Sequence, residues 1–187
     1  MIHQSANIFS KPDSHKLGLS NVLLIAGDGR NVGKTTLGCK IVSRISGDMK
    51  VVALKVSPHF HPLTDSLQVL YNSESIVIAR ETNKTSGKDS SRYLNAGAAE
   101  VYYIQSKEDG LNILASWMKD NFSPEIPVIC ETGGLGRVID PSYSIFIKSG
   151  TGNDDQSLIP NSETVYNNDH PENIEINIHW QNQKWQK

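Results

Sequence analysis

The alternation of apolar and polar positions predicts short buried strands connected by amphipathic helices. Residues 22–26 are all apolar and end at Gly27, and this run is too short for a helix, so it predicts a buried strand. From Thr35 onward the apolar residues recur at helical spacing, with Leu37 and Ile41 on one stripe. A helix therefore follows the strand directly.

The same pattern continues along the chain. Residues 51–56 predict a second strand, and the order strand–helix–strand indicates a parallel pair with a right-handed crossover. Further strands are predicted at 75–80, 101–104, 126–131 and 144–148, and further helices at 64–71, 89–96 and 109–122. The last helix has the clearest apolar face: Leu111, Leu114, Ala115, Met118 and Phe122. We expect an α/β fold with a doubly wound, mainly parallel sheet.

The two ends of the chain differ from this pattern. Residues 1–20 are polar and predict an N-terminal arm, which leaves 21–187 as a single domain. Residues 150–172 are rich in Asn, Asp and Ser and predict a polar surface connection. Alternating isoleucines near 174–178 and a turn near 181–183 predict an edge hairpin over 173–187.

Composition narrows the class of protein. The 187 residues carry a formal net charge of -2, so no broad basic field indicates nucleic acid as a partner. No apolar run approaches the roughly 20 residues that span a bilayer, and residues 1–20 lack a secretion signal. Two cysteines, Cys39 and Cys130, favour reduced buried thiols over a disulfide framework. We expect a cytoplasmic protein that binds neither membrane nor nucleic acid.

The stretch from Gly27 to Thr36 has the pattern of a phosphate-binding (Walker A) loop, because a strand feeds a glycine-rich turn that opens a helix. Glycines let the backbone approach phosphates, Lys34 supplies a cation for the β- and γ-phosphates, and the Thr35 hydroxyl is a natural Mg²⁺ ligand. The predicted nucleotide-binding residues are Gly27, Gly29, Arg30, Asn31, Val32, Gly33, Lys34, Thr35 and Thr36.

The loop departs from the common pattern at one position. Where G-x-x-x-x-G-K-[ST] has its first glycine, this chain has Asp28, and the glycine comes one residue earlier, at Gly27. The loop of dethiobiotin synthetases looks similar. The motif favours nucleotide binding over an ordinary glycine-rich turn, but it does not select the base.

An acid at the end of a buried strand completes the predicted magnesium site. Residues 126–130 are mostly apolar and lead to Glu131, which is the Walker B arrangement of a strand-end carboxylate beside the phosphate loop. Thr35 and Glu131 are the predicted metal ligands. Lys34, Glu131 and Asp89 are the predicted catalytic residues.

Further polar residues follow the second strand. Lys55, His59 and His61 lie at its carboxyl end, where ligands bind in open α/β sheets, so they are candidates for phosphate or partner contacts. The two histidines lack a carboxylate or cysteine at ligand spacing, which favours loop histidines over a metal site.

A second cluster begins the helix predicted at 89–96, which Asp89 or Ser90 can cap and Gly97 can end. Its charged residues Lys88, Asp89 and Arg92 fit either a solvated surface or, with Ser90, a second phosphate or partner site. Both interpretations stay open. The guanine-reading Asn-Lys-x-Asp motif is absent, because Ser86 takes the position of its aspartate.

Three blocks together resemble the molybdopterin-guanine dinucleotide biosynthesis adaptor family (MobB). They are the phosphate loop, the strand Ala53-Leu-Lys55 followed by histidines, and Gly87-Lys-Asp-Ser-Ser-Arg-Tyr-Leu-Asn-Ala-Gly-Ala98. The resemblance covers roughly 22–148. It implies a P-loop fold of the signal-recognition/MinD type, a homodimer, GTP and Mg²⁺ binding, weak hydrolysis, and a helper role beside a molybdenum cofactor guanylyltransferase.

The resemblance also assigns residues and has limits. It implies that nucleotide and Mg²⁺ bind at Gly29, Gly33, Lys34, Thr35 and Thr36. The family's histidines correspond to His59 and His61, and its strand-end acid corresponds to Glu131. Its second signature corresponds to Lys88, Asp89, Ser90 and Arg92. The chain departs from the family at Asp28, at Thr132-Gly-Gly134, where the family has an aromatic-Lys step, and in its C-terminal extension.

Three functions follow from these patterns. The leading hypothesis is a GTP-binding adaptor with weak NTPase activity, in which Arg30 or Arg137 could act on the phosphates. The second is an ATP-dependent ligase of the dethiobiotin-synthetase type, with ATP in place of GTP. The third is a nucleotide-binding module without turnover that acts through a protein partner.

Overall fold

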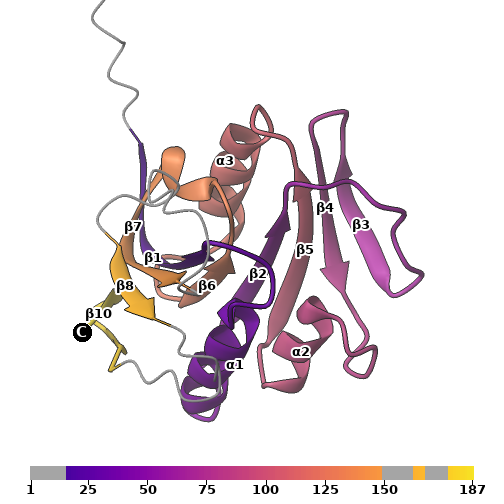
Figure 1. Cartoon of the computed structure of the whole chain (residues 1–187). Coiled ribbons are helices and arrows are strands. Elements are labelled where there is room, and N and C mark those ends of the chain that lie inside the picture. The colour runs from indigo at the N-terminus through magenta and orange to yellow at the C-terminus, as the bar shows by residue number, and fades with distance from the viewer. Residues whose placement is uncertain (1–15, 149–161, 167–176) are drawn as a thin grey trace, which may run out of the picture.

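The computed structural model describes residues 16–148, 162–166 and 177–187. An eight-stranded sheet forms its centre, in the order β3-β4-β5-β2-β6-β1-β7-β8, and a separate two-stranded sheet pairs β9 with β10. Helices cover both faces of the large sheet (Figure 1). The predicted α/β class with a mainly parallel sheet is therefore confirmed. No helix in the described ranges is both long and apolar enough to cross a membrane.

The strands are β1 (Leu17–Gly27), β2 (Val52–Ser57), β3 (Leu67–Asn72), β4 (Ile76–Glu81), β5 (Glu100–Ser106), β6 (Val128–Glu131), β7 (Ile139–Lys148), β8 (Glu163–Tyr166), β9 (His179–Gln181) and β10 (Lys184–Gln186). The helices are α1 (Lys34–Ile45), α2 (Asp89–Asn95), α3 (Leu111–Asn121) and the 3₁₀ turn η1 (Leu135–Arg137). Strands thus alternate with helices through most of the chain, as the apolar pattern predicts.

Five neighbouring strand pairs run parallel: β5–β2, β2–β6, β6–β1, β1–β7 and β7–β8. The β3–β4 and β4–β5 pairs are antiparallel. The phosphate-loop motif follows β1, whose two neighbours are both parallel to it. The carboxyl ends of β1, β2 and β6 therefore meet at one edge, next to the start of α1.

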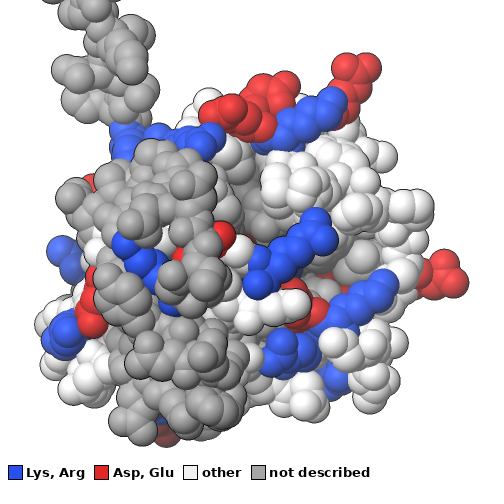
Figure 2. All heavy atoms as spheres, in the orientation of Figure 1, with Lys and Arg blue, Asp and Glu red and all other residues white. Residues whose placement is uncertain are grey.

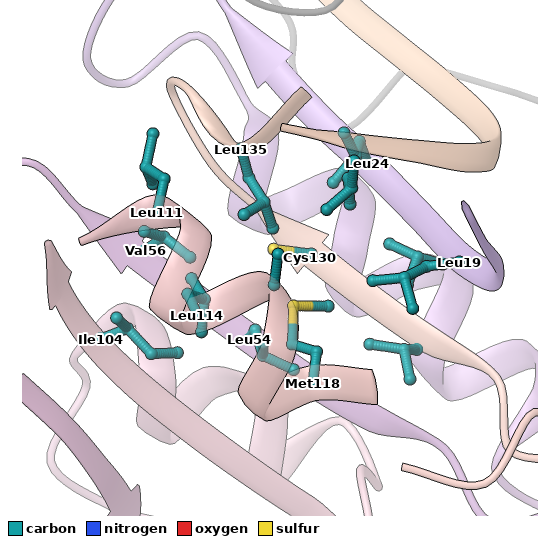
Figure 3. Packing of buried hydrophobic residues seen from close by; sticks show 14 of the residues in the cluster. Leu19, Leu24, Leu54, Val56, Ile104, Leu111, Leu114, Met118, Cys130 and Leu135 are labelled. Carbon is teal, nitrogen blue, oxygen red and sulfur yellow. The ribbon is translucent and has the colours of Figure 1, made fainter. Parts of the chain in front are cut away.

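Two cores lie on opposite faces of the sheet. On one face α3 packs its predicted stripe against β1, β2, β5 and β6, and Figure 3 shows Leu114 and Met118 of α3 facing Leu54 and Cys130 of the sheet. On the other face α1 and α2 pack against the alternate residues of the same strands, such as Leu23. Buried parallel strands supply apolar residues to both faces, which explains their continuous apolar runs.

The helix predicted at 64–71 is wrong, because this segment forms β3 and pairs with β4. A tight turn joins the two strands, in which the Ser73 N–H donates to the Ile76 carbonyl at 2.9 Å. Val69, Leu70 and Tyr71 are consecutive and exposed, so they form neither a helical stripe nor a buried strand face. Pairing with β4 decides the structure here.

The ends of the domain also differ from expectation. β1 begins at Leu17, inside the predicted arm, and β8 lies inside the predicted polar connection. The predicted edge position of the hairpin is wrong, since β9 and β10 form their own sheet. Trp185 of β10 is buried on the α1 face and its Nε1–H donates to the Asn21 carbonyl at 2.9 Å. Residues 1–15, 149–161 and 167–176 lie outside the described ranges.

Candidate nucleotide and magnesium site

The candidate site lies where the carboxyl ends of β1, β6 and β2 meet. In the sheet register Ile25 pairs with Glu131, and Glu131 pairs with Lys55 on the opposite side. Along β6, Ile129 faces α1, so the period-two alternation also turns Glu131 toward α1. Lys55 shares that face for the same reason. The sheet thus brings the predicted acid and the predicted lysine together below the glycine loop (residues 27–33).

Backbone geometry explains two glycines of this loop. A Cβ at Gly27 would lie 2.7 Å from the Ile147 carbonyl oxygen and 2.8 Å from Val32 Cγ2, so a side chain does not fit there. Gly33 has a φ of 98°, which is favourable for glycine alone. Close contact with β7 and with Val32 therefore explains why position 27 is a glycine.

The loop leads into α1, whose N-terminus has no side-chain cap. Uncapped backbone N–H groups at a helix start are suited to an anion. The Lys34 ammonium turns back and donates to the Gly29 carbonyl, which closes the loop. Burial lowers the pKa of Lys34, although the Glu131 carboxylate acts in the opposite direction. A bound polyanion would favour the charged form of this lysine.

Glu131 is the centre of a buried network, with 2% of its surface exposed. The Thr35 hydroxyl donates to Oε2 at 2.7 Å, and the Tyr93 hydroxyl donates to the same oxygen at 3.3 Å. The Lys55 ammonium forms an ion pair with Oε1. Both carboxylate oxygens are therefore held by donors from α1, α2 and β2.

The network extends to the start of α2. Lys55 Nζ lies 3.0 Å from Asp89 Oδ2, and Arg92 Nη1 lies 3.6 Å from Asp89 Oδ1. Arg92 also donates through Nη2 to the Thr36 hydroxyl of α1 at 3.1 Å. Burial opposes the charge on Lys55, but the Glu131 and Asp89 carboxylates together outweigh burial and raise the pKa of this lysine. Lys55 is thus a shared cation between two carboxylates.

Above this network lies a cavity of about 940 Å³, which is at the upper end of the size of ligand pockets. The glycine loop and start of α1 line one side, and residues 57–64 and 87–92 line the others. Figure 2 shows basic side chains, with acidic atoms between them, near the middle of the face where α1, α2 and β2 meet.

The structure brings almost all predicted site residues to this cavity. Its lining contains Gly27, Gly29, Arg30, Asn31, Gly33, Lys34, Thr35, Thr36, Lys55, His59, His61, Lys88, Asp89, Ser90, Arg92 and Glu131. Val32 is different, because its side chain is buried in the core on the α1 face. Arg137 is also placed elsewhere: it pairs with Glu108 and does not line the cavity.

The residues predicted for a second phosphate or partner site have different environments. His59 and His61 are exposed, with ring centroids 6.2 Å apart. The backbone of His61 is fixed, since Gln105 accepts from its N–H at 3.3 Å and donates to its carbonyl at 2.9 Å. Ser90 is buried and donates to Glu81 Oε2 at 2.7 Å, so its hydroxyl is already engaged. The start of α2 is Lys88 in extended conformation, without the predicted side-chain cap.

Several contributors to the site were not among the predicted site residues. Among them, Tyr103 and Thr132 line the cavity, and Tyr93 contacts Glu131 from the protein interior. Thr132 follows the strand-end acid directly, and that position is a signal that could have identified it. Tyr93 is buried on an amphipathic helix, where a tyrosine looks like an ordinary core residue.

The donor set fits a magnesium ion. Thr35, Glu131 and Asp89 offer oxygen ligands, which Mg²⁺ prefers. The described residues contain no group of three or more His, Cys, Asp or Glu side chains that could hold a metal alone. Mg²⁺ commonly takes one or two protein ligands and keeps water and substrate phosphates for the rest. This arrangement could serve such an ion.

The thiols of Cys39 and Cys130 are not suited to metal binding or nucleophilic chemistry at this site. Burial raises the pKa of Cys39 to about 11, and burial also raises the pKa of Cys130. Both therefore remain protonated near neutral pH, which makes them poor nucleophiles and metal ligands. Among the described residues both are free cysteines, as the sequence predicts.

A scan against models of protein families finds no match, and neither does a search of curated proteins or of solved structures. The functional argument therefore rests on the residues of the site and on their geometry.

Proposed function

We propose that this protein binds a nucleoside triphosphate with Mg²⁺ in the cavity above Glu131 and hydrolyses it slowly. The observation that carries the proposal is the 2.7 Å hydrogen bond from Thr35 at the start of α1 to Glu131 at the end of β6, beside Lys34. A hydroxyl that donates to Glu131 keeps its lone pairs for a cation. Thr35 would then ligate Mg²⁺, and Glu131 would hold a water of the ion.

The residues around the cavity would have different roles in nucleotide binding. Lys34 and the N–H groups at the start of α1 would neutralise the phosphates, and the ion, when bound, supplies further neutralisation. Arg30 lines the cavity and could contact the terminal phosphate. The described lining contains no glutamine to orient an attacking water, which supports slow hydrolysis.

We further propose a P-loop protein of the signal-recognition/MinD class that acts as an adaptor, binding GTP and assisting a molybdenum cofactor guanylyltransferase as a homodimer. The support is the resemblance of the loop, the histidine segment and the Gly87–Ala98 block to the MobB family, together with the central parallel strands. In the structure all three blocks border the cavity.

A second candidate, an ATP-dependent ligase of the dethiobiotin-synthetase type, is supported by the extent of the cavity. Besides the glycine loop and Lys55, its lining includes His59, His61 and Tyr103, and its volume of about 940 Å³ leaves room for a second small substrate. ATP turnover that requires a small carboxylated substrate would favour this enzyme. Binding without any phosphate release, with or without a partner, would favour a module without turnover.

The test is the melting temperature of the purified protein with GTP, ATP and their diphosphates, each with and without Mg²⁺. A ligand at 100 times its dissociation constant stabilises the folded state by about 2.7 kcal/mol. We expect a Mg²⁺-dependent rise with GTP. A rise with ATP alone would move the ligase to first place, and no rise with either nucleotide would overturn the proposed function.

Lys34→Ala tests the site itself. We expect the variant to lose binding by about 100-fold, because a charge-assisted contact to phosphate is worth up to roughly 3 kcal/mol. Lys40→Ala is the matched control, since Lys40 is exposed on the same helix and does not line the cavity. Calorimetric titration gives both affinities. Unchanged affinity in Lys34→Ala would contradict the assignment of the loop.

A further inference from the structure

The strand-end acid has a partner that the proposed function does not use. Tyr93 of α2 is fully buried, and its hydroxyl donates to Glu131 Oε2 at 3.3 Å. The same oxygen accepts the hydrogen bond from Thr35. Tyr93 does not line the cavity, so it approaches the carboxylate from the protein interior.

Helix α1 is built to admit this ring. A Cβ at Gly38 would lie 2.3 Å from the Tyr93 hydroxyl oxygen and 2.7 Å from Cε1. No side chain other than hydrogen fits at that position unless the tyrosine moves. Glycine inside a helix costs about 0.5–1 kcal/mol relative to alanine. Glycine at position 38 therefore lowers the stability of the helix, but it allows the Tyr93 hydroxyl to reach Glu131.

Tyr93 differs from the other two donors to Glu131 in its position. Thr35 and Lys55 both line the cavity, whereas Tyr93 is fully buried behind the carboxylate. Lys55 is also shared with Asp89, and Thr35 is the residue that would contact the ion. Tyr93 is the donor that a ligand cannot displace by direct contact.

We propose that Tyr93 is a positioning residue for magnesium: it fixes the orientation of the Glu131 carboxylate, and Gly38 makes room for it. This inference rests on the proposed function. Partners that orient a metal-binding group typically change metal affinity by 10–100-fold when they are removed. The tyrosine hydroxyl should therefore affect the magnesium-dependent part of nucleotide binding and leave the magnesium-free part unchanged.

The experiment compares Tyr93→Phe with the wild type. Calorimetric titration with GTP, and with ATP, is done with EDTA and then over a series of Mg²⁺ concentrations. We expect the Mg²⁺ concentration at half-maximal binding to rise about tenfold in the variant. The affinity in EDTA should stay within twofold of the wild type, and the ring should keep the variant folded, as its melting curve without ligand will report.

Tyr102→Phe is the matched control. Its hydroxyl also donates to a carboxylate, that of Glu100, but neither residue lines the cavity. We expect its magnesium dependence to equal that of the wild type. The positioning role would be overturned if Tyr93→Phe had the same magnesium dependence as the wild type, or if it lost the same affinity with and without Mg²⁺. Either result would leave the proposed function standing. Absence of Mg²⁺-dependent binding in the wild type would overturn the proposed function as well.

Discussion

The two faces of the central sheet differ in what they bury. The α3 face is a continuous apolar core, in which Tyr102, Trp117 and Phe122 pack edge to face or at a tilt with centroids 5.1–5.6 Å apart. The α1 face has an equally buried apolar part, which includes the Tyr93 ring, but at the carboxyl ends of the strands Thr35 and Glu131 interrupt it.

The same strands supply both faces. On β6, Cys130 belongs to the apolar core on the α3 side and Glu131 faces α1. A core residue and a residue of the candidate site are therefore adjacent in the chain. A buried carboxylate is costly unless its partners surround it. The charged end of the α1 face must therefore depend on a complete set of donors, whereas the α3 face depends on the burial and close packing of apolar side chains.

The largest expected effect is on the α3 face. Leu114 is fully buried there, so Leu114→Ala should lower the free energy of unfolding by about 2–5 kcal/mol through lost contacts and a cavity. The affinity for nucleotide should stay unchanged at temperatures where the variant is folded. Urea denaturation and calorimetric titration check the two statements. A large loss of affinity would show that the two faces are not independent.

A smaller effect on stability is expected on the α1 face. Glu131→Gln leaves the half-buried Lys55 cation with Asp89 as its acidic partner, so unfolding should become easier by about 2 kcal/mol, below the 3–5 typical of a pair broken without a substitute. Here the affinity for Mg²⁺-nucleotide should fall together with stability.

The control for this variant is Glu108→Gln, which breaks the exposed pair with Arg137 on the molecular surface. We expect it to cost less than about 1 kcal/mol, because exposed pairs contribute little. Urea denaturation of both variants measures the difference. Equal costs would mean that the buried network contributes no more than a surface pair, which would remove the proposed contrast between the faces.

The smallest expected effect is the pH dependence at Asp89. Burial alone would raise the pKa of this carboxyl, but Lys55, Thr35 and Arg92 together outweigh burial and lower it. Asp89 therefore stabilises the fold above the ordinary pKa of about 3.9, and this contribution is lost as the pH falls through the lower folded value. Because the side chain is 43% exposed, the contribution should stay below about 1 kcal/mol.

The measurement compares the wild type with Asp89→Asn by urea denaturation between pH 7 and pH 3. The wild type should be slightly more stable at pH 7, and the two curves should approach each other below about pH 4. A gap that stays constant across this range would mean that the ion pair with Lys55 does not stabilise the folded chain.

The sequence could predict the parts of the site that are local. The loop, α1 and the acid at 131 follow from spacing within one segment, because a strand, a turn and a helix start are short-range features. The contact of Tyr93 with Glu131 spans 38 positions, and only the packing of α2 on α1 creates it. For the same reason the residues around Gly38 do not indicate that a glycine is needed there.

Strand β3 was missed for a different physical reason. Its side chains from Gln68 to Asn72 are exposed, so neither a period of two nor a period of 3.6 marks them. Hydrogen bonds to β4, and not burial, hold the segment in the sheet. A pattern based on apolar positions has no information about such a strand.

The pairing of Glu131 with Lys55 across neighbouring strands has a consequence for how the chain folds. Parallel strands such as β2 and β6 carry apolar side chains on both faces. A one-residue slip exchanges the two faces but still buries apolar side chains, so burial alone specifies the register only weakly. A slip of β6 by one residue would turn Glu131 into the apolar α3 face, at a cost on the order of several kcal/mol. The residues that serve the candidate site therefore also select the correct alignment of the sheet.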